Sequence, residues 1–385
     1  MSFESIEYDQ LSSTLGVTSV ELSSSALGGK VLGCSDEWFA EATNLIKPHP
    51  AESLKGQFGP NGALYDGWET RRHNPTYDWA MIRLGPSGGG RITGFDIDTT
   101  TFSGNEGPAA AVYGMDLANS SEVPGADDDR WELLLPKVPC GPFAHHVYAY
   151  SDPAGTQKKY THILLHMIPD GGFSRFRVYG VVSPAPIGHG VSETAVPDHP
   201  ELNTVDLVHV LNGGRVVFTN DQHFGIGPNI LLPGRGVNMG DGWETKRSRT
   251  PNHYDWVVVK LAEPGVPDLV EIDTIHFLGN FPESFVLDGC NYQGEGNIPQ
   301  DHDTLESPSW IPLTKRSKLG PGKQHYFSVL PDARKKVFTH VRLTIFPDGG
   351  IKRLRLIGRR AAALESAGIT TPEQLADLPE TPTPN

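Results

Sequence analysis

The chain has 385 residues, of which 37% are hydrophobic and 20% charged, and its formal net charge is −14. Its length predicts two domains, or three, and the acidic charge argues against nucleic acid as a partner, which would need a basic face. No stretch approaches the ~18 apolar residues of a membrane span, and the acidic start MSFESIEYDQL lacks the features of a signal peptide. With three widely spaced cysteines, we expect a cytoplasmic protein with free thiols.

An internal repeat organises the chain. The segment LYDGWETRRHNPTYDWAMIRLG begins at Leu64, and GDGWETKRSRTPNHYDWVVVKL begins at Gly240. Later, THILLHMIPDGGFSRFRVYG from Thr161 matches THVRLTIFPDGGIKRLRLIG from Thr339. The spacing is far longer than the ~20–50 residues of a solenoid repeat, so each copy is predicted to be a domain.

The repeat divides the chain into five predicted parts. A Pro-rich polar segment between the copies reads as a linker, and the C-terminal tail is expected to begin with a short helix. The predicted parts are a loosely held N-terminal arm (1–25), repeat 1 (26–183), the linker (184–206), repeat 2 (207–360) and the tail (361–385).

Within each copy the hydrophobic period is two. Phe95 and Ile97 alternate with Asp96 and Asp98, which places apolar groups on one face of a strand. The same alternation recurs in FSRFRVYG, and each PDGG sequence predicts a turn in which Gly supplies a positive φ. Many short strands with Gly/Pro turns indicate an all-β protein of two tandem homologous jelly-roll β-sandwich domains.

The DGWET segment is the most charged stretch that the copies share. Asp-Gly pairs favour turns, and loops at the end of a sandwich often carry sites. Purely structural interpretations stay open here. Asp66 and Asp241 could close their turns, and Glu69 with Arg71 or Arg72 could be a surface ion pair that contributes little to stability. Trp68 and Trp243 are expected in the core or at its rim, and Trp79 and Trp256 in the core.

The histidines give weaker signals. His146 aligns with His325, so this repeated histidine is either an acid/base group or a structural one. His162 and His166 lie four apart, but their segment reads as a strand, where that spacing spans roughly 13 Å, too far for one metal ion. We therefore predict no metal site.

The DGWETRR…YDW segment, the following Gly-Asn and the closing PDGG…R-x-R resemble the pattern of the allantoicase family across both repeats. The resemblance implies tandem jelly rolls of the galactose-binding-like type. It also implies hydrolysis of allantoate to ureidoglycolate and urea in purine degradation, with allantoate as a small-molecule partner. We further expect a homo-oligomer and no membrane association.

Under this resemblance the residues receive roles. Proton transfer and activation of water need paired carboxylates or a carboxylate with a histidine, and a guanidinium group suits a substrate carboxylate. The acid/base candidates are Glu69, Glu244, Asp66, Asp241, His146 and His325. The candidates for substrate binding are Arg71, Arg72, Arg247, Lys246, Asn105 and Asn280.

Several alternatives stay open from sequence alone. Both repeats could be catalytic, or they could share one composite site. No cofactor is expected; some family members are linked to a divalent metal, but no clear ligand set supports one. The rival interpretation is a non-catalytic jelly-roll binding module for a small polar or carbohydrate ligand, since fold does not fix function. Convergence of the charged residues would favour the enzyme.

Overall fold

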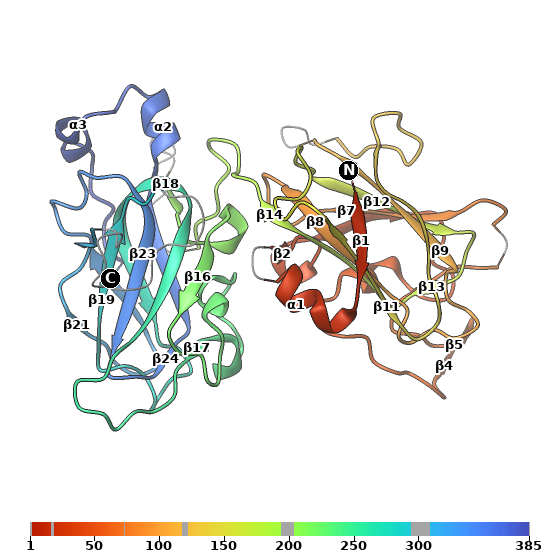
Figure 1. Ribbon diagram of the computed structural model, residues 1–385, viewed down its shortest axis with the longest axis horizontal. Helices are drawn as coiled ribbons and strands as arrows, with labels where there is room; N and C mark the ends of the chain where they lie inside the picture. Colours follow the sequence, from red (N-terminus) through yellow and green to blue (C-terminus); the bar gives the residue numbers. More distant parts are fainter. Residues whose placement is uncertain are drawn as a thin grey trace. The chain divides into compact units, whose positions relative to one another are not determined.

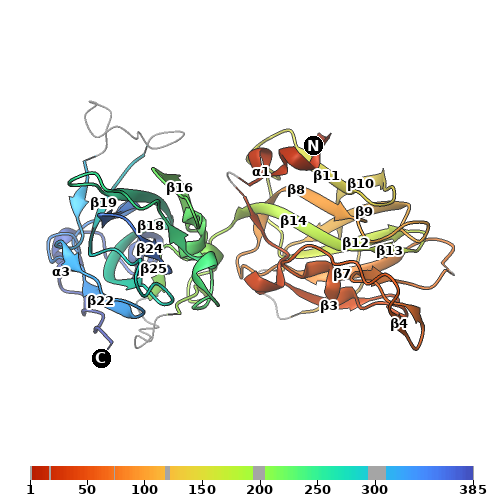
Figure 2. The same ribbon diagram turned by 90° about the horizontal axis from the view of Figure 1, so that it is seen from below.

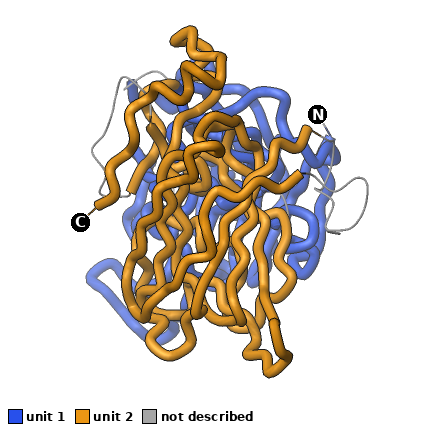
Figure 3. The backbone as a smooth tube through the Cα atoms, turned by 90° about the vertical axis from the view of Figure 1, so that its left-hand side faces the viewer, with its two compact units in different colours: residues 1–186 blue, residues 187–385 orange. Residues whose placement is uncertain are grey.

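The computed structural model describes residues 2–16, 19–72, 74–117, 122–193, 204–293 and 309–384. It divides into two compact units, Met1–Pro186 and Ile187–Asn385 (Figures 1 and 3). The division falls within the predicted linker, of which residues 194–203 lie outside the described part. Both units are built from antiparallel strands, so the prediction of two all-β domains is confirmed.

Unit 1 contains two five-stranded sheets (Figure 2). The first has the order β1 (Phe3–Ile6), β11 (His145–Tyr150), β8 (Gly90–Asp98), β14 (Arg175–Val182) and β2 (Val20–Glu21). The second has the order β10 (Glu132–Pro139), β9 (Ala109–Met115), β12 (His162–Ile168), β7 (Asp78–Arg83) and β3 (Lys30–Cys34). Non-sequential neighbours such as β8 and β14 are typical of a jelly roll.

The core of unit 1 lies between these sheets. Phe95 and Ile97 belong to it as the alternation predicted, together with Ala80 and Ile82 of β7. The prediction that Trp79 lies in the core is wrong, because Ala80 and Ile82 take the inward positions of β7. Trp79 is therefore half-buried on the opposite face, and Trp256 is likewise only half-buried.

The N-terminal segment is more ordered than the loosely held arm that we predicted. β1 pairs with β11, and β2 pairs with β14. Between them, α1 (Leu11–Thr14) precedes Leu15, which is buried against Val147 and Ala149. The physical reason is that sheet edges carry unpaired backbone groups, which these two short strands cover.

In unit 2 one long strand replaces two. β18 (Asp255–Asp273) pairs first with β23 (Phe338–Phe346) and then with β25 (Arg353–Arg360). The corresponding strands of repeat 1, β7 and β8, are separated at the Gly-rich stretch 85–89. The remaining strands of this nine-stranded sheet are β15 (Thr204–Asp206), β16 (Arg215–Thr219), β19 (Ser284–Cys290), β20 (Ile311–Pro312), β21 (Ser317–Lys318) and β22 (Gln324–Ser328).

Short strand pairs fix the loops that carry the shared motif. β6 (Trp68–Glu69) pairs with β13 (Gly172–Phe173), and β17 (Trp243–Glu244) pairs with β24 (Gly350–Ile351). Gly171 and Gly349 of the PDGG turns have φ of +140° and +135°, which confirms the turn prediction. Unit 1 also has a hairpin of β4 (Phe58–Gly59) and β5 (Gly62–Ala63).

The C-terminal tail contains two short helices where one was predicted. They are α2 (Ala361–Ser366) and α3 (Pro372–Ala376), the latter with a capping box at Thr371. Leu364 and Leu375 are buried against Val266, so the helices pack on unit 2. Within the described residues, no helix is both long and apolar enough to cross a membrane.

Candidate active site

The shared motif holds its glutamate on a rigid base in repeat 1. Trp68 is fully buried, and its indole N–H donates to the Asp36 carbonyl at 2.8 Å. Gly67 must be glycine, because a Cβ there would lie 2.5 Å from the Phe173 carbonyl oxygen. Glu69 follows on β6, where pairing with β13 fixes its backbone.

Three predicted site residues converge in repeat 1, and we call Glu69, Arg72 and Asn105 the repeat 1 cluster. Glu69 Oε1 accepts hydrogen bonds from Asn105 Nδ2 at 3.0 Å and from Arg72 Nη2 at 3.2 Å. Arg72 also donates to the carbonyl oxygens of Thr70 at 2.8 Å and Asn105 at 2.9 Å. The interpretation as an ion pair is therefore correct, but the carboxylate is not on the open surface.

Glu69 is only 6% exposed. Burial raises the pKa of its carboxyl, and the hydrogen bond from Asn105 and the charge of Arg72 reduce this rise without cancelling it. A carboxyl group whose pKa moves toward neutrality can both donate and accept a proton, which general acid–base catalysis requires.

Repeat 2 builds a related but smaller group, which we call the repeat 2 cluster: Glu244 and Asn280. Glu244 Oε1 accepts from Asn280 Nδ2 at 2.6 Å. Arg247, which aligns with Arg72, is exposed, and its guanidinium group makes no hydrogen bond or ion pair with the described part of the chain. The two repeats thus share the glutamate–asparagine pair and differ in how the arginine is used.

Arg71 and Lys246 occupy the position before these arginines. Arg71 Nε donates to Asp36 Oδ2 at 2.6 Å, and its guanidinium lies 5.3 Å from the centre of the Trp38 ring. The Lys246 backbone N–H donates to Asp221 Oδ2 at 2.5 Å. In both repeats an aspartate therefore accepts a hydrogen bond from the backbone N–H of this residue, which fixes the chain just after β6 and β17.

Asp66 and Asp241 do not join the clusters. Asp66 Oδ2 lies 2.6 Å from Nη2 of the buried Arg175, and Asp241 pairs with Lys352 and with Arg353. Burial would raise the pKa of Asp66, but the hydrogen bonds from Arg175 and from the Glu52 N–H, together with the charges of Arg175 and Lys47, outweigh burial and lower that pKa. These aspartates hold the loop to the R-x-R strand.

The hydrogen bonds that the structure shows for the two aligned histidines do not reach Glu69 or Glu244. His146 Nε2 bonds to the backbone of Gly141 at 3.0 Å, and His325 Nε2 accepts from the Gly320 N–H at 2.8 Å. Burial lowers the pKa of His325. Their contacts favour the structural alternative, in which each histidine closes the loop before its own strand.

Comparison with known proteins decides the relationship. A family model described as the allantoicase repeat matches residues 20–183 and 205–361, so it covers both units. The chain belongs to the allantoicase family. The sequence resemblance is thereby confirmed, and the match begins and ends close to the predicted repeats.

Individual allantoicases agree over most of their length. The chain is 46% identical to a probable allantoicase of Schizosaccharomyces pombe, covering 94% of this chain and 100% of the relative. It is 41% identical to the allantoicase of Saccharomyces cerevisiae, covering 88% and 93%. A crystal structure of the latter superposes with a TM-score of 0.70 at 37% identity, over 93% of this chain and 100% of that one.

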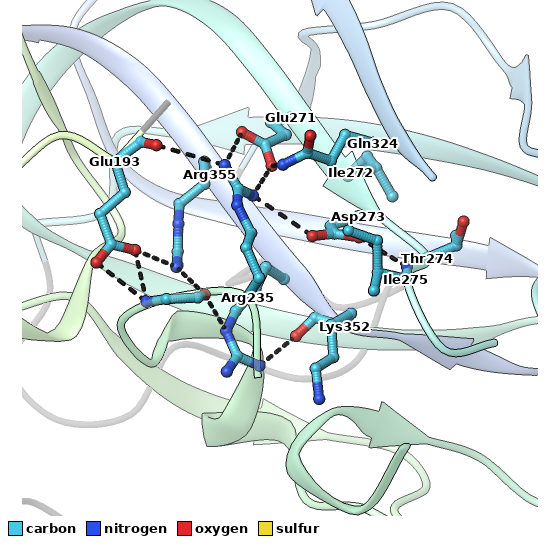
Figure 4. A network of polar contacts seen from close by, with 12 residues as sticks. Glu193, Arg235, Glu271, Ile272, Asp273, Thr274, Ile275, Gln324, Lys352 and Arg355 are labelled. Atoms are coloured by element: carbon cyan, nitrogen blue, oxygen red, sulfur yellow. Dashed lines mark hydrogen bonds and ion pairs between the residues drawn. The ribbon is translucent and has the colours of Figure 1, made fainter. Parts of the chain in front are cut away.

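One charged network of this allantoicase-family chain escaped the sequence analysis. On β18 the buried Glu271 and Asp273 pair with Arg235, and Arg355 Nη2 lies 2.8 Å from Glu193 (Figure 4). The alternation in β18 and β25 signalled a charged outer face, but it could not show that loops cover this face. Through Glu193, this network ties the predicted linker to repeat 2.

Glu193 is the anchor of that attachment. Burial would raise its pKa, but the interaction with His209, whose Nε2 lies 3.5 Å away, the hydrogen bond from the Gly234 N–H and the charge of Arg355 together outweigh burial and lower the pKa to about 2. Repeat 1 has a smaller equivalent: His145 Nδ1 lies 2.9 Å from Asp96, with the ring of Tyr8 stacked on it at 3.6 Å.

No cluster suited to a metal ion is found among the described residues. Nowhere in that part of the chain do three His, Cys, Asp or Glu side chains gather in a suitable arrangement. His162 and His166 lie on β12 as predicted, and the Nδ1 of His162 bonds to Thr161 at 2.9 Å. That the protein has no metal site thus stays a prediction, which experiment can test.

Proposed function

We infer that this chain hydrolyses allantoate to ureidoglycolate and urea, and that the reaction takes place at the repeat 1 and repeat 2 clusters. The activity follows from membership of the allantoicase family. The observation that carries the site is the shared pair: Glu69 with Asn105, and Glu244 with Asn280.

The substrate chemistry fits a buried carboxyl group. Allantoate carries a carboxylate and two ureido groups on one carbon, so release of urea needs a proton on the departing nitrogen and an activated water. A desolvated Glu69, with its raised pKa, is suited to deliver the proton and to recover it from water. Asn105 holds the carboxyl in one orientation, and Asn280 does the same for Glu244.

The arginines divide between two tasks. Arg72 has donors bound to Glu69 and to two carbonyl oxygens, so it positions the glutamate. Arg247 is exposed and makes no hydrogen bond or ion pair with described residues, so its planar guanidinium is available for the substrate carboxylate. We propose Arg247 as the carboxylate anchor of the repeat 2 cluster.

Urea release by the purified protein tests this function and site. Wild-type protein should release urea from allantoate, and Glu69→Gln and Glu244→Gln should each lower the rate. Glu132→Gln is a matched control, because Glu132 is an exposed glutamate on β10. Full activity in both test variants would refute the assignment of the clusters.

The same assay tests two further proposals. We propose that no cofactor is required, so activity should survive a chelator. The binding-module alternative is not favoured, because the relatives are allantoicases over nearly their whole length. Folded protein that bound allantoate without releasing urea would revive it. A homo-oligomer and a cytoplasmic location remain predictions.

A further inference from the structure

Unit 1 contains a pocket of about 430 Å³ that no role has yet been given. Its walls come from residues 53–56, from residues 63–65 beside the β4–β5 hairpin, from Thr100, Thr101 and Ser103, and from Phe143. The hairpin lies at the lower right of Figure 1. This volume falls within the usual range for small-molecule sites.

One residue of the pocket wall, Ser103, is hydrogen-bonded to the repeat 1 cluster. The backbone N–H of Ser103 donates to Asn105 Oδ1 at 3.1 Å. The amide of the same side chain donates to Glu69 Oε1 at 3.0 Å. Two consecutive hydrogen bonds thus join the wall of the pocket to the proposed acid/base group.

Repeat 2 lacks the parts from which this pocket is built. Residues 49–65 of repeat 1 correspond to the much shorter segment 234–240, which has no such hairpin. Ser103 aligns with Leu278, an exposed apolar residue. The two repeats therefore differ beside their otherwise matching glutamates.

Phe143 is the least expected residue in the wall. It has φ of +54°, a conformation that residues other than glycine rarely adopt, yet the residue is 65% exposed. The aligned residue is Gly322, with φ of +62°. The N–H groups of both donate equivalently, to Phe102 O at 3.1 Å and to Phe277 O at 3.2 Å.

The turn therefore forms equally with glycine at this position, so its hydrogen bond does not require the phenylalanine side chain. Backbone strain at an exposed aromatic residue calls for a function outside the turn. A ring at the mouth of a pocket offers a flat surface on which a planar group can stack.

The polar lining defines the ligand. The Lys55 ammonium group is exposed and pairs with no residue that the structure describes. The hydroxyl groups of Ser53, Thr100 and Ser103 supply donors and acceptors, and Phe143 supplies a flat face. A small anion with a planar, hydrogen-bonding group matches this combination of charge, hydroxyls and ring.

We propose that this pocket binds a ureido carboxylate through Phe143 and Lys55, and that it makes repeat 1 the substrate-selecting repeat. The inference rests on the proposed function for the identity of the ligand. The ureido plane stacks on Phe143, the carboxylate pairs with Lys55, and the reacting carbon is directed toward Glu69 along the wall that carries Ser103.

The test uses hydantoate, a ureido carboxylate with a single ureido group, as a probe that cannot release urea in the same way. Calorimetry on full-length protein should detect its binding, weakened about tenfold in Phe143→Gly and in Lys55→Gln, which is the effect of losing one charged hydrogen bond or stacked contact. The glycine variant restores the residue of repeat 2 and should fold. Phe58→Ala is the matched control, because Phe58 is a 75% exposed aromatic of the same hairpin outside the pocket.

Kinetics separate this inference from the proposed function. In both variants the KM for allantoate should rise about tenfold while kcat stays within about twofold, since only binding is removed. Unchanged hydantoate affinity and unchanged KM, with urea still released, would overturn the pocket and leave the hydrolase intact. Hydantoate binding that both variants weaken, without any release of urea, would support the pocket and refute the hydrolase.

Discussion

Arg72 and Arg247 occupy the same position in the two repeats, yet only Arg72 is held by described neighbours. Arg72→Ala removes three hydrogen bonds, one to a carboxylate and two to carbonyl oxygens. Bonds to charged groups contribute ~1.5–3 kcal/mol each when buried, but the Arg72 side chain is 41% exposed, and exposed pairs contribute ~0.2–1 kcal/mol. We therefore expect a total loss of roughly 1–2 kcal/mol.

Thermal unfolding measures this difference. For a domain of this size each 1 kcal/mol lowers the Tm by about 2–4 °C, so Arg72→Ala should lower the Tm of its unit by about 2–8 °C. Arg247→Ala is the matched control and should change stability by less than about 0.5 kcal/mol. Equal shifts in the two variants would refute the reasoning.

The same variant has a signature in activity. Arg72 lowers the pKa of Glu69, although burial still leaves it raised. Removing the guanidinium should raise that pKa further, so the limb of the kcat/KM–pH profile that belongs to Glu69 should move to higher pH. A limb that stayed in place would show that Glu69 does not control the rate.

Substitutions of four other charged residues test the site and the ion pairs that hold each unit together. Glu69→Gln and Glu244→Gln should each lower kcat at their own site by about 10²–10⁴-fold, with no loss of stability, since an amide keeps the accepted hydrogen bond; a destabilised protein would contradict this. Arg175→Ala should cost about 3–5 kcal/mol, because this fully buried guanidinium pairs with Asp66 and donates to the carbonyl oxygens of His49 and Asp66; a clearly smaller loss in chemical denaturation would contradict this. The pKa of Glu193 is lowered to about 2 in the folded protein, so its ionised form should add up to roughly 3 kcal/mol to the free energy of unfolding at pH values above its unfolded pKa of about 4.5. This contribution should be lost as the pH falls toward 2. In an acid titration Glu193→Gln should therefore lose less stability than the wild type, and equal losses would contradict this.

The sequence predicted the fold well because its signals are local and repeated. Alternation in β8 and β14 placed Phe95 and Val178 in the core, and the PDGG turns have the positive φ that they require. The N-terminal arm was misjudged, because pairing of β1 with β11 joins residues far apart in the chain. No pattern within the arm itself could show that a sheet edge was available.

The candidate site was predicted only in part for a related reason. Glu69, Arg72 and Asn105 were nominated, and they do meet. Asp66 was nominated from the same motif, yet its side chain turns to Arg175, which the sequence places on a distant strand. The sequence prediction places neighbouring residues of the motif in one site, whereas in the structure Asp66 and Glu69 contact different partners.

A last signal was present in the sequence and was missed. Aligning GPFAHH with GPGKQH sets Phe143 against Gly322. Where one repeat has glycine and the other has a larger residue, the backbone conformation favours glycine, so the larger side chain is expected to make a contact of its own. The structure adds the positive φ and the pocket, without which the comparison points to no chemistry.

Release of urea from allantoate by the purified full-length protein tests the central claim most directly. The account predicts turnover with and without a chelator, and its reduction in Glu69→Gln and Glu244→Gln but not in Glu132→Gln. Protein shown to be folded by circular dichroism that releases no urea would contradict it.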